Sequence, residues 1–578
     1  MNVLSEHHCT TNPPSLHLFL QEELVFFFFH NYRNASYSND IRIIQRFDTV
    51  LSLIKRNINN RVTKEYLILF YRLLADTRSI LSGKGDHHFS YLMLFVWYKY
   101  FPTLAIYALH RFVKCIDGQH AEFGSWRDIK YLCQFISTCS DKQRDDPFIE
   151  ICCDMLNSQL DTDLQIQNIY ALPIHSQSIS NVAKWIPRER KQFDWLYQKL
   201  VIHWIQKNKP YILCSATDAS YFSAVSKSKR LYRKKISMLN KTIDTTQIKQ
   251  CARNRHDINP HHVSRYTQMK QPNLVFGYGD NDIDDRQSCS QHFKEWADFN
   301  LSALSDTTYP PVAPLPIYHY VKLAYLLIDN PSHLSPHQHC SQINALNKQW
   351  SIMSKSFTPY RFGYSIPIID VSDSTSDMNS DSYYSAIGYA ILFAQYSSIS
   401  NRILTVSNVP TWINLDNTSG FVSIVKRIQS AIYPPGFNSL SLSSPHFNKA
   451  VHLIGKTIQE SSLSGQDIRN LRLILFSSFS NMSSQSPLYD NIVSILSQYC
   501  FHIPFIAFWN LSKCFGKILP CSIHQYSAVM LSGFSPILLN KLLTKFKRYH
   551  TTPYNTVCNI LRNPHYDVLE NYIVQLIG

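Results

Sequence analysis

The stretch YSIPIIDVSDSTSD (Tyr364–Asp377) joins a short apolar run to a dense group of oxygen side chains. The residues before Asp370 have the length and apolar character of a buried β-strand. Asp370, Ser372 and Ser374 follow at alternate positions, so that hard oxygen ligands gather directly after this strand. The stretch is therefore either a metal-binding loop or a Ser/Asp-rich turn in which Ser372 and Ser374 cap the next helix.

Strand-like and helix-like runs alternate from Tyr364 toward the end of the chain. The strand-like runs are YSIPIID (364–370), RILTVS (402–407), RLILFSS (472–478), IPFIAFWN (503–510) and YSAVMLSG (526–533). The helix-like runs lie at 383–397, 420–432, 447–458, 489–500 and 536–548. This alternation is typical of a doubly wound parallel sheet, so residues 361–578 are predicted to form an α/β domain. Such sheets bind ligands at the carboxyl ends of their strands, which is where Asp370 lies.

The N-terminal part of the sequence shows helical spacing of its apolar residues. Helix-like runs include 48–58, 65–81, 128–138, 194–207 and 234–243. A longer apolar stretch, Tyr91–Val113, is predicted to form two buried helices that meet at Pro102. We therefore expect residues 1–270 to form an all-α, irregular helical-repeat array. Residues 271–360 are expected to be an irregular linker with helices that close the helical region.

The composition favours a polyanionic partner. Lys and Arg outnumber Asp and Glu by 56 to 41, which gives a net charge of +15, and nucleic acid is the commonest intracellular polyanion. The alternative is that the charge serves solubility. The 14 cysteines contain no Cys-x-x-Cys pair and Asn2–His8 is polar, so reduced thiols and a cytoplasmic location are expected. Leu24–Phe29 is too short to cross a bilayer, and no membrane partner is expected.

Six segments of the chain resemble, in order, those of a known family. They are LADTRSILSGKGDHHFSYLMLFVWYKYFP (74–102), FGSWRDIKYL (123–132), AKWIPRERKQFDWL (183–196), YRKKISMLNKTI (232–243), FIAFWNL (505–511) and AVMLSGFSPILLNKLL (528–543). Together with the Asp-x-Ser-x-Ser cluster, they resemble a TROVE-like family of large DNA viruses, fungi, plants and bacteria that is built like the Ro ribonucleoprotein. The resemblance implies a HEAT-like, TROVE-like helical array followed by a von Willebrand factor A-like domain.

The resemblance implies a metal-ion-dependent adhesion site in the A-type domain. Its ligands would be Asp370, Ser372 and Ser374, with Ser439 at the position of the family's threonine, and its ion Mg²⁺ or another divalent cation. Ser478 stands where the family has its last aspartate, so one carboxylate is missing from the surroundings of the ion. The resemblance thus implies a degenerate metal site, with structural serines as the alternative.

The resemblance also implies that RNA lies on the helical array. The candidate residues for phosphate contacts are the basic residues of the matching segments and their neighbours: Lys84, Arg127, Lys184, Arg188, Arg190, Lys227, Lys229, Arg230, Arg233, Lys234 and Lys235, with Arg78 and Lys191 beside them. Trp126, Trp185 and Tyr232 are candidates for stacking on unpaired bases. Burial of the tryptophans as helix anchors, a helix-joining turn around Lys84 and a solvated helix face at 227–235 are the alternatives.

These features predict a non-enzymatic RNA-binding protein. The alternative is a protein-interaction scaffold whose A-type domain binds an acidic residue of a protein partner through its ion. The sequence contains no nucleophile elbow, phosphate-binding loop, zinc-protease helix or kinase motif. His256, His261 and His262 lie near Arg253 and Arg255, but they lack a carboxylate set and are interpreted as surface histidines of a basic loop.

Overall fold

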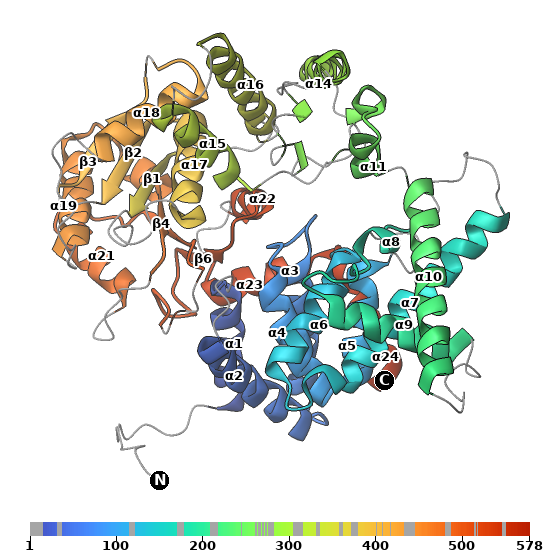
Figure 1. Ribbon diagram of the computed structural model, residues 1–578. Coiled ribbons are helices and arrows are strands. Elements are labelled where there is room, and N and C mark those ends of the chain that lie inside the picture. The colour runs from blue at the N-terminus through green and yellow to red at the C-terminus, as the bar shows by residue number, and fades with distance from the viewer. Residues whose placement is uncertain are drawn as a thin grey trace.

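The computed structural model of the protein describes most of the chain. The described residues are 15–31, 37–114, 122–169, 179–208, 218–243, 245–260, 263, 267–268, 271, 274–275, 283–303, 316–330, 336–355, 357, 362–370, 380–399, 401–406, 409–416, 418–432, 445–479, 487–513, 516, 518–545 and 551–577. They form a mostly helical N-terminal part and a part built on a mixed sheet, called the helical part and the α/β part below (Figure 1).

The helical part is a series of packed helices, as the sequence predicts. They are α1 (Leu16–Phe29), α2 (Tyr37–Arg56), α3 (Arg61–Arg78), α4 (His87–Tyr100), α5 (Pro102–Val113), α6 (Arg127–Cys139), α7 (Pro147–Ile169), α8 (Val182–Trp185), α9 (Asp194–Asn208) and α10 (Asp218–Thr242). The meeting of two helices at Pro102 is confirmed, because Pro102 is the first residue of α5, where a missing N–H breaks no helical hydrogen bond. Each helix packs on its neighbours: α4 on α2, α3 and α5, and α7 on α9 and α10.

The segment between the two parts differs from the expectation. It contains α11 (Thr246–Cys251), α14 (Ile283–Ala303), α15 (Tyr318–Asp329) and α16 (Pro336–Lys355). The last two helices pack on α17 (Asp381–Tyr396) and α18 (Phe421–Ile432) of the α/β part. For example, the Trp350 ring of α16 stacks on Phe421 of α18, with ring centroids 3.9 Å apart. The helices at 318–355 therefore cover the α/β part, although the sequence led us to expect that they close the helical region.

The α/β part is built on a six-stranded sheet with the order β3-β2-β1-β4-β5-β6. Its strands are β1 (Ser365–Asp370), β2 (Arg402–Val406), β3 (Thr411–Asn414), β4 (Arg472–Ser477), β5 (Phe505–Asn510) and β6 (Ala528–Ser532). The five predicted strands are confirmed and pair in parallel, while β3 is an additional strand that pairs antiparallel to β2. After β1, the chain adds β2 and β3 on one side of that strand and then β4, β5 and β6 on its other side. The strand order therefore reverses between β1 and β4.

Helices cover both faces of the sheet, which explains why its strands are apolar throughout. On one face, Phe476 of β4 packs under α17, where the Tyr389 ring lies parallel to it at 5.7 Å. On the other face, Leu475 lines a small apolar cavity with Val451 of α19 (Pro445–Glu460) and Ile492 of α21 (Leu488–Leu496). Neighbouring residues of one strand thus face different helices, as the alternation of side chains along a strand requires.

The last helices of the chain return to the helical part. After α22 (Ile537–Lys545), α23 (Pro553–Leu561) packs on α1 and α3, and α24 (Asp567–Ile577) packs on α3. The C-terminus accordingly lies among the helices of the helical part (Figure 1). Arg72 of α3 ties these elements together, because its guanidinium donates to the Leu561 carbonyl at 3.0 Å and to the Asp567 carboxylate at 2.7 Å. Residues 553–577, predicted as part of the α/β domain, are therefore attached to both parts.

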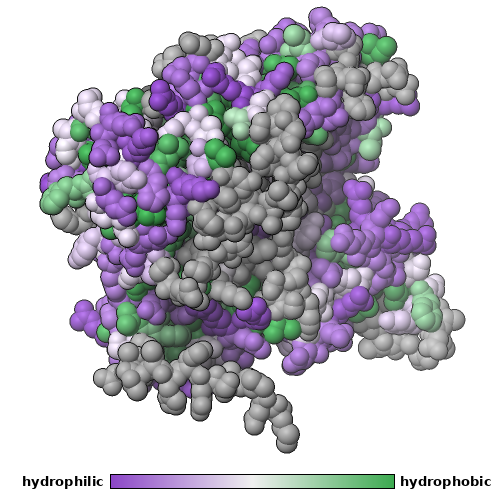
Figure 2. Space-filling view, turned by 90° about the vertical axis from the view of Figure 1, so that its left-hand side faces the viewer, coloured by the Kyte–Doolittle hydropathy of each residue, from purple (hydrophilic) through white to green (hydrophobic). Residues whose placement is uncertain are grey.

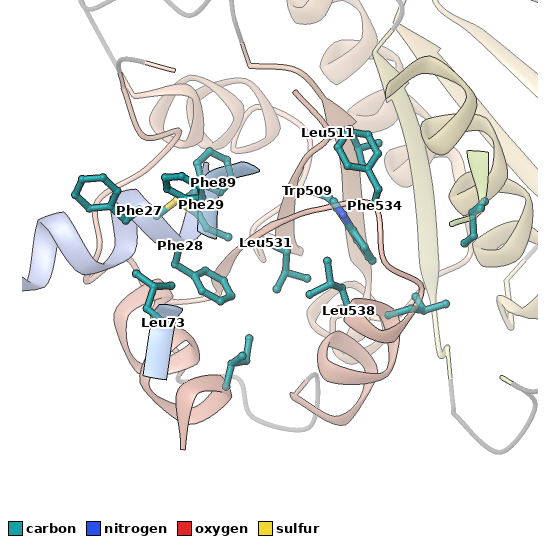
Figure 3. Close-up of a cluster of buried hydrophobic side chains, with 14 of the residues drawn as sticks. Phe27, Phe28, Phe29, Leu73, Phe89, Trp509, Leu511, Leu531, Phe534 and Leu538 are labelled. Carbon is teal, nitrogen blue, oxygen red and sulfur yellow. The ribbon is translucent and has the colours of Figure 1, made fainter. Parts of the chain in front are cut away.

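One continuous apolar core joins the two parts. Figure 3 shows the phenylalanines at the end of α1 on one side and Trp509, Leu531 and Leu538 on the other. Phe28 and Trp509 are fully buried, and so is Leu538. Because this apolar surface would face water if the parts separated, the contact stabilises their present arrangement.

The described surface is mixed in character. On the side of the α/β part, hydrophobic residues are interspersed with hydrophilic ones (Figure 2). Among the described helices, none combines the length and the apolar character that crossing a membrane demands. The cysteines within the described ranges are free thiols.

Candidate functional site

The carboxyl edge of the sheet carries Asp370, as the sequence predicts. Asp370 is the last residue of β1, next to the point at which the strand order reverses. Ser477, the last residue of the neighbouring strand β4, donates its hydroxyl hydrogen to the Asp370 carboxylate, with an O···O distance of 2.6 Å. Open α/β sheets bind ligands at this position because the chains of the two halves diverge and leave a crevice there.

Of the predicted metal ligands, Asp370 is the one among the described residues. Ser372, Ser374 and Ser439 lie outside the described residues. Ser478, in place of the family's aspartate, is half-buried directly after β4. The side chain that caps α17 is Ser380, which accepts a hydrogen bond from the Tyr383 N–H. Within the described ranges, His, Cys, Asp and Glu side chains form no group of three or more suited to a metal.

The end of α1 covers the same edge of the sheet at β5 and β6. Asn510 of β5 donates to the Phe29 carbonyl at 2.9 Å, and Ser532 of β6 donates to the Phe28 carbonyl at 2.6 Å. These carbonyls belong to the last turn of α1, where a helix leaves its C=O groups without helical partners. The strand ends thus satisfy the carbonyls of α1, and the predicted ligand position at β1 and β4 lies beside this contact.

The structure places Lys84 inside this contact and away from the surface. Its side chain is 1% exposed. The ammonium donates to the Phe28 carbonyl, to the His30 carbonyl at 3.3 Å and to the Ser532 hydroxyl at 2.6 Å. Burial lowers the pKa of Lys84 to about 7. Lys84 is therefore too deeply buried to contact RNA. The alternative prediction, a turn that joins two helices, is confirmed, because Lys84 lies between α3 and α4.

Arg78 is another buried basic residue of the matching segments. Its guanidinium donates to the Asp128 carboxylate at 2.6 Å, and both side chains are at most 5% exposed. Tyr91 donates to the second oxygen of Asp128 at 2.5 Å. These three residues join α3, α4 and α6, so this part of the family resemblance marks a structural network of the helical part.

The basic run of α10 lies on the surface. With about 100° of rotation per residue, Lys227, Lys229, Arg230, Arg233 and Lys234 occupy an arc of about 160° of the helix. Ser228, Tyr232 and Leu239 form the opposite, buried side of α10. Five of the six basic residues between 227 and 235 therefore share one surface face, on which Lys229 is half-buried and the other four are exposed. The sixth, Lys235, turns toward α7 and pairs with Asp161. This face is called the α10 basic face below and comprises Lys227, Lys229, Arg230, Arg233 and Lys234.

Among the described residues, most charges of the α10 basic face have no acidic partner. Arg233 pairs with Glu189 at 2.6 Å. Within the part of the chain that the structure describes, Lys227, Lys229, Arg230 and Lys234 form no ion pair. Their positive charge is thus available to a polyanion from solution. Glu189 pairs with this face through Arg233, and its two neighbours in the chain, Arg188 and Arg190, are exposed in the loop after α8.

The three aromatic candidates differ in their accessibility. Tyr232 is fully buried, with its hydroxyl donating to Asn157 at 2.8 Å, and Trp126 is 5% exposed. Trp185 at the end of α8 is only partly buried. Three cationic groups lie near its ring, since Lys130 Nζ, the Arg127 guanidinium carbon and Lys184 Nζ are 5.4, 5.7 and 5.9 Å from its centroid. Trp185 is therefore the accessible aromatic candidate, and the interpretation of Trp126 as a buried anchor is confirmed.

Lys130 also lies near the Trp185 ring, although it was not among the RNA-contacting residues predicted from the sequence. It lies one helical turn after Arg127 on α6, beside Tyr131, whose ring centroid is 5.2 Å from its ammonium. A spacing of three residues on a helix places two side chains on the same face, so the sequence contained a usable signal. That signal becomes meaningful only once α8 is known to pack on α6.

His256, in the predicted basic loop, pairs with an acidic residue. His256 Nδ1 lies 2.7 Å from the Asp285 carboxylate, which also accepts the N–H groups of Arg255 and His256. Together with the Arg255 side chain, these hydrogen bonds lower the pKa of Asp285 to about 2 against the opposing effect of burial. Asp285 therefore anchors the loop to α14. A shallow depression beside it is lined by His256, His292 and Glu295. His261 and His262 lie outside the described residues.

The α/β part of the chain is similar to a family of protein domains. Residues 364–557 match the model of a family described as a domain of unknown function (DUF7788). The matched region begins next to β1, includes the whole sheet with α17 to α22, and ends within α23. The chain matches no curated protein.

Proposed function

We propose that the protein binds RNA without chemically changing it, and that the α10 basic face is its main electrostatic contact. The observation that carries the proposal is the set of four cationic side chains on this face that form no ion pair within the described ranges. Lys and Arg groups in such an arrangement neutralise phosphates and release the counterions of the nucleic acid. The net charge of +15 supports the proposal, since it attracts polyanions over longer distances.

The resemblance to Ro-type proteins agrees with this assignment. It suggests that RNA follows the helical part, which we infer to be a TROVE-like array, and α10 belongs to that part. The loop after α8 extends the α10 basic face through Arg188 and Arg190, which are exposed. Arg127 and Lys184 lie near Trp185 at the far end of this surface.

A charge-reversal experiment tests the proposal. The variant K227E/K229E/R230E/K234E of the full-length protein is compared with the wild type by fluorescence anisotropy of a labelled single-stranded RNA over a range of salt concentrations. We expect a loss of affinity of at least about a hundredfold, together with a decrease of about three in the slope of log K against log salt. The salt slope separates lost phosphate contacts from a general loss of folded protein.

The matched control reverses four exposed lysines of the α/β part and its covering helices, in the variant K322E/K426E/K449E/K456E. Its net charge changes by the same amount, so long-range attraction weakens equally in both variants. If both variants lose the same affinity, RNA does not contact the α10 basic face. If wild-type protein shows no salt-dependent RNA binding at all, the proposed function itself fails.

A second candidate function concerns the α/β part, which we infer to be a von Willebrand factor A-like domain. The observation that favours it is the position of Asp370 at the reversal of the strand order, where such sheets bind ligands. Asp370 with Ser372, Ser374 and Ser439 offers hard oxygen donors, which suit Mg²⁺. A bound ion would supply a coordination position for a carboxylate of a protein partner, while Ser477 holds Asp370 in place.

The two functions are distinguished by what depends on the ion. Affinity purification of wild-type protein and of Asp370→Ala, with and without a chelator, measures the bound protein and RNA separately. The interaction function predicts a protein partner that is lost with chelator and in the variant, while the RNA content stays constant. If the same partners remain in all four samples, the α/β part does not use Asp370 for their recognition.

A further inference from the structure

Cationic side chains converge on the partly exposed ring of Trp185. Arg127 and Lys130 come from α6, Lys184 precedes Trp185 in α8, and Arg188 follows in the next loop. The first three lie 5.4–5.9 Å from the ring centroid, at distances at which a cation is attracted to an aromatic face. Lys130 also lies 5.0 Å from the centroid of Phe193. These four cations and Trp185 are called the Trp185 cluster below.

The positive charges of the Trp185 cluster repel one another. Besides burial, the largest cause, the charges of Arg127 and Arg188 lower the pKa of Lys130. Burial also lowers the pKa of Lys184. The repulsion among Lys130, Arg127 and Arg188 would be relieved by a negative charge placed between them.

The acidic residues closest in sequence are already engaged elsewhere. Asp128 accepts hydrogen bonds from Arg78, Tyr91 and the Ser125 N–H, and its side chain is only 3% exposed. Glu189 pairs with Arg233, and Asp194 accepts the Arg190 N–H at 2.7 Å. In the described part of the chain, none of the four cations of the cluster forms an ion pair. An anion from solution could therefore contact all four charges without displacing an acidic side chain of the described residues.

We propose that the Trp185 cluster binds a nucleotide with an unpaired base, which stacks on Trp185 while its phosphates contact the surrounding cations. The ligand must combine an aromatic surface with negative charge, because the cluster offers an aromatic face and cations side by side. A base within a duplex hides its faces between its neighbours, so only an unpaired base presents one to Trp185. The inference rests on the proposed function and names the RNA class that the protein selects, namely single-stranded RNA.

Replacement of Trp185 tests the stacking contact. The full-length variants Trp185→Leu and Trp195→Leu are titrated by fluorescence anisotropy into a labelled short oligoadenylate and into a blunt RNA duplex of the same length. Trp195 is the matched control, because it is also partly buried in the helical part and has one cation, Arg144, 5.2 Å from its ring. We expect Trp185→Leu to weaken oligoadenylate binding by about fivefold to about 150-fold, and duplex binding by less than about twofold. Trp195→Leu should leave both affinities unchanged.

A second variant tests the cations without altering the core. Arg127→Gln with Lys130→Gln removes two charges near Trp185, and Lys142→Gln with Arg144→Gln removes two exposed charges shortly after α6. The first pair should weaken oligoadenylate binding by about tenfold through lost phosphate contacts, and the second pair should leave it unchanged. This comparison remains decisive if Trp185→Leu does not fold.

The outcomes separate the two proposals. If oligoadenylate binds equally well to wild type and to R127Q/K130Q, or if Trp185→Leu and Trp195→Leu lose the same affinity, the stacking site is refuted. The proposed function survives that result as long as reversal of the α10 basic face still weakens RNA binding. A wild-type protein that binds neither oligoadenylate nor duplex refutes both.

Discussion

The ammonium of Lys84 and the hydroxyl of Ser532 lie 2.6 Å apart in the buried contact between the helical part and the sheet. Ser532 donates in turn to the Phe28 carbonyl, so that the two side chains and the end of α1 form a small closed network. A loop residue of the helical part and the last residue of a strand thereby satisfy the carbonyls of one helix end. The contact between the two parts is polar at this point, beside the apolar core that they share.

Replacing Ser532 with Ala should destabilise the folded protein. The variant leaves Lys84 with one acceptor fewer and the Phe28 carbonyl with one donor fewer, and a lost hydrogen bond costs about 0.5–1.5 kcal/mol, or about 1.5–3 kcal/mol where one group is charged. Urea unfolding followed by circular dichroism measures the change in the free energy of unfolding. Ser497→Ala is the control, because Ser497 is exposed. Equal stabilities of the two variants would mean that the network adds nothing to the contact between the two parts.

Acid should destabilise the contact between the helical part and the sheet, because His30 is buried there without a proton. Burial lowers the pKa of His30 from 6.5 to about 3, helped by the charges of Lys84 and Arg46. Between these values the unfolded chain binds a proton that the folded protein does not, so stability is present above pH 6.5 and is lost as the pH falls toward 3. The loss amounts to at most about 1.4 kcal/mol per pH unit.

The measurement compares urea unfolding of the wild type and of His30→Asn, whose side-chain amide preserves a donor near the Phe26 carbonyl that His30 contacts at 2.8 Å. The free energy of unfolding should fall more steeply with acidification in the wild type than in the variant. Parallel curves would show that His30 takes up its proton equally well in the folded and unfolded states.

Mg²⁺ should stabilise the protein if Asp370 belongs to a metal site. A ligand at about a hundred times its dissociation constant adds about 2.7 kcal/mol to the free energy of unfolding. Asp370→Ala should abolish the rise in Tm with Mg²⁺, since it removes the carboxylate of the site. Ser477→Ala should weaken Mg²⁺ binding by about tenfold to about a hundredfold, because Ser477 only orients Asp370.

Thermal unfolding with increasing Mg²⁺ measures both effects. Asp416→Ala serves as the control, because Asp416 is an exposed carboxylate outside the strand-end cluster. A wild-type Tm that does not respond to Mg²⁺, or a response that persists in Asp370→Ala, would count against the metal site.

The sequence predicted most helices and strands correctly, but it did not predict how they pack on one another. Apolar runs such as RLILFSS reveal a buried strand directly, and the structure places β4 at Arg472–Ser477. The strand β3 escaped prediction because Thr411–Asn414 is a four-residue strand at the sheet edge, with no continuous apolar run. The return of α23 and α24 to α1 and α3 depends on contacts between residues almost a whole chain apart, which no local pattern encodes.

In the candidate sites, too, local sequence predicted some features, while others depend on packing between distant parts of the chain. The placement of Asp370 after a strand followed from local sequence, and the basic run at 227–235 was visible as composition. Burial of Lys84 was not foreseeable, because a lysine between two glycines usually lies in an exposed turn. The difference between Trp185 and Trp126 likewise arises from packing between helices, since the two residues look alike in the sequence.

The contact between α1 and the strand β5 has a consequence for synthesis. Phe29 accepts a hydrogen bond from Asn510, and the two residues are 481 positions apart. At a translation rate of about 5–20 residues per second, Asn510 is synthesised about 25–95 s after Phe29. During this time the aromatic end of α1 lacks the strand that covers it. Apolar surface that stays exposed for so long during synthesis favours aggregation, so we expect this end of α1 to be a contact for chaperones until β5 has been made.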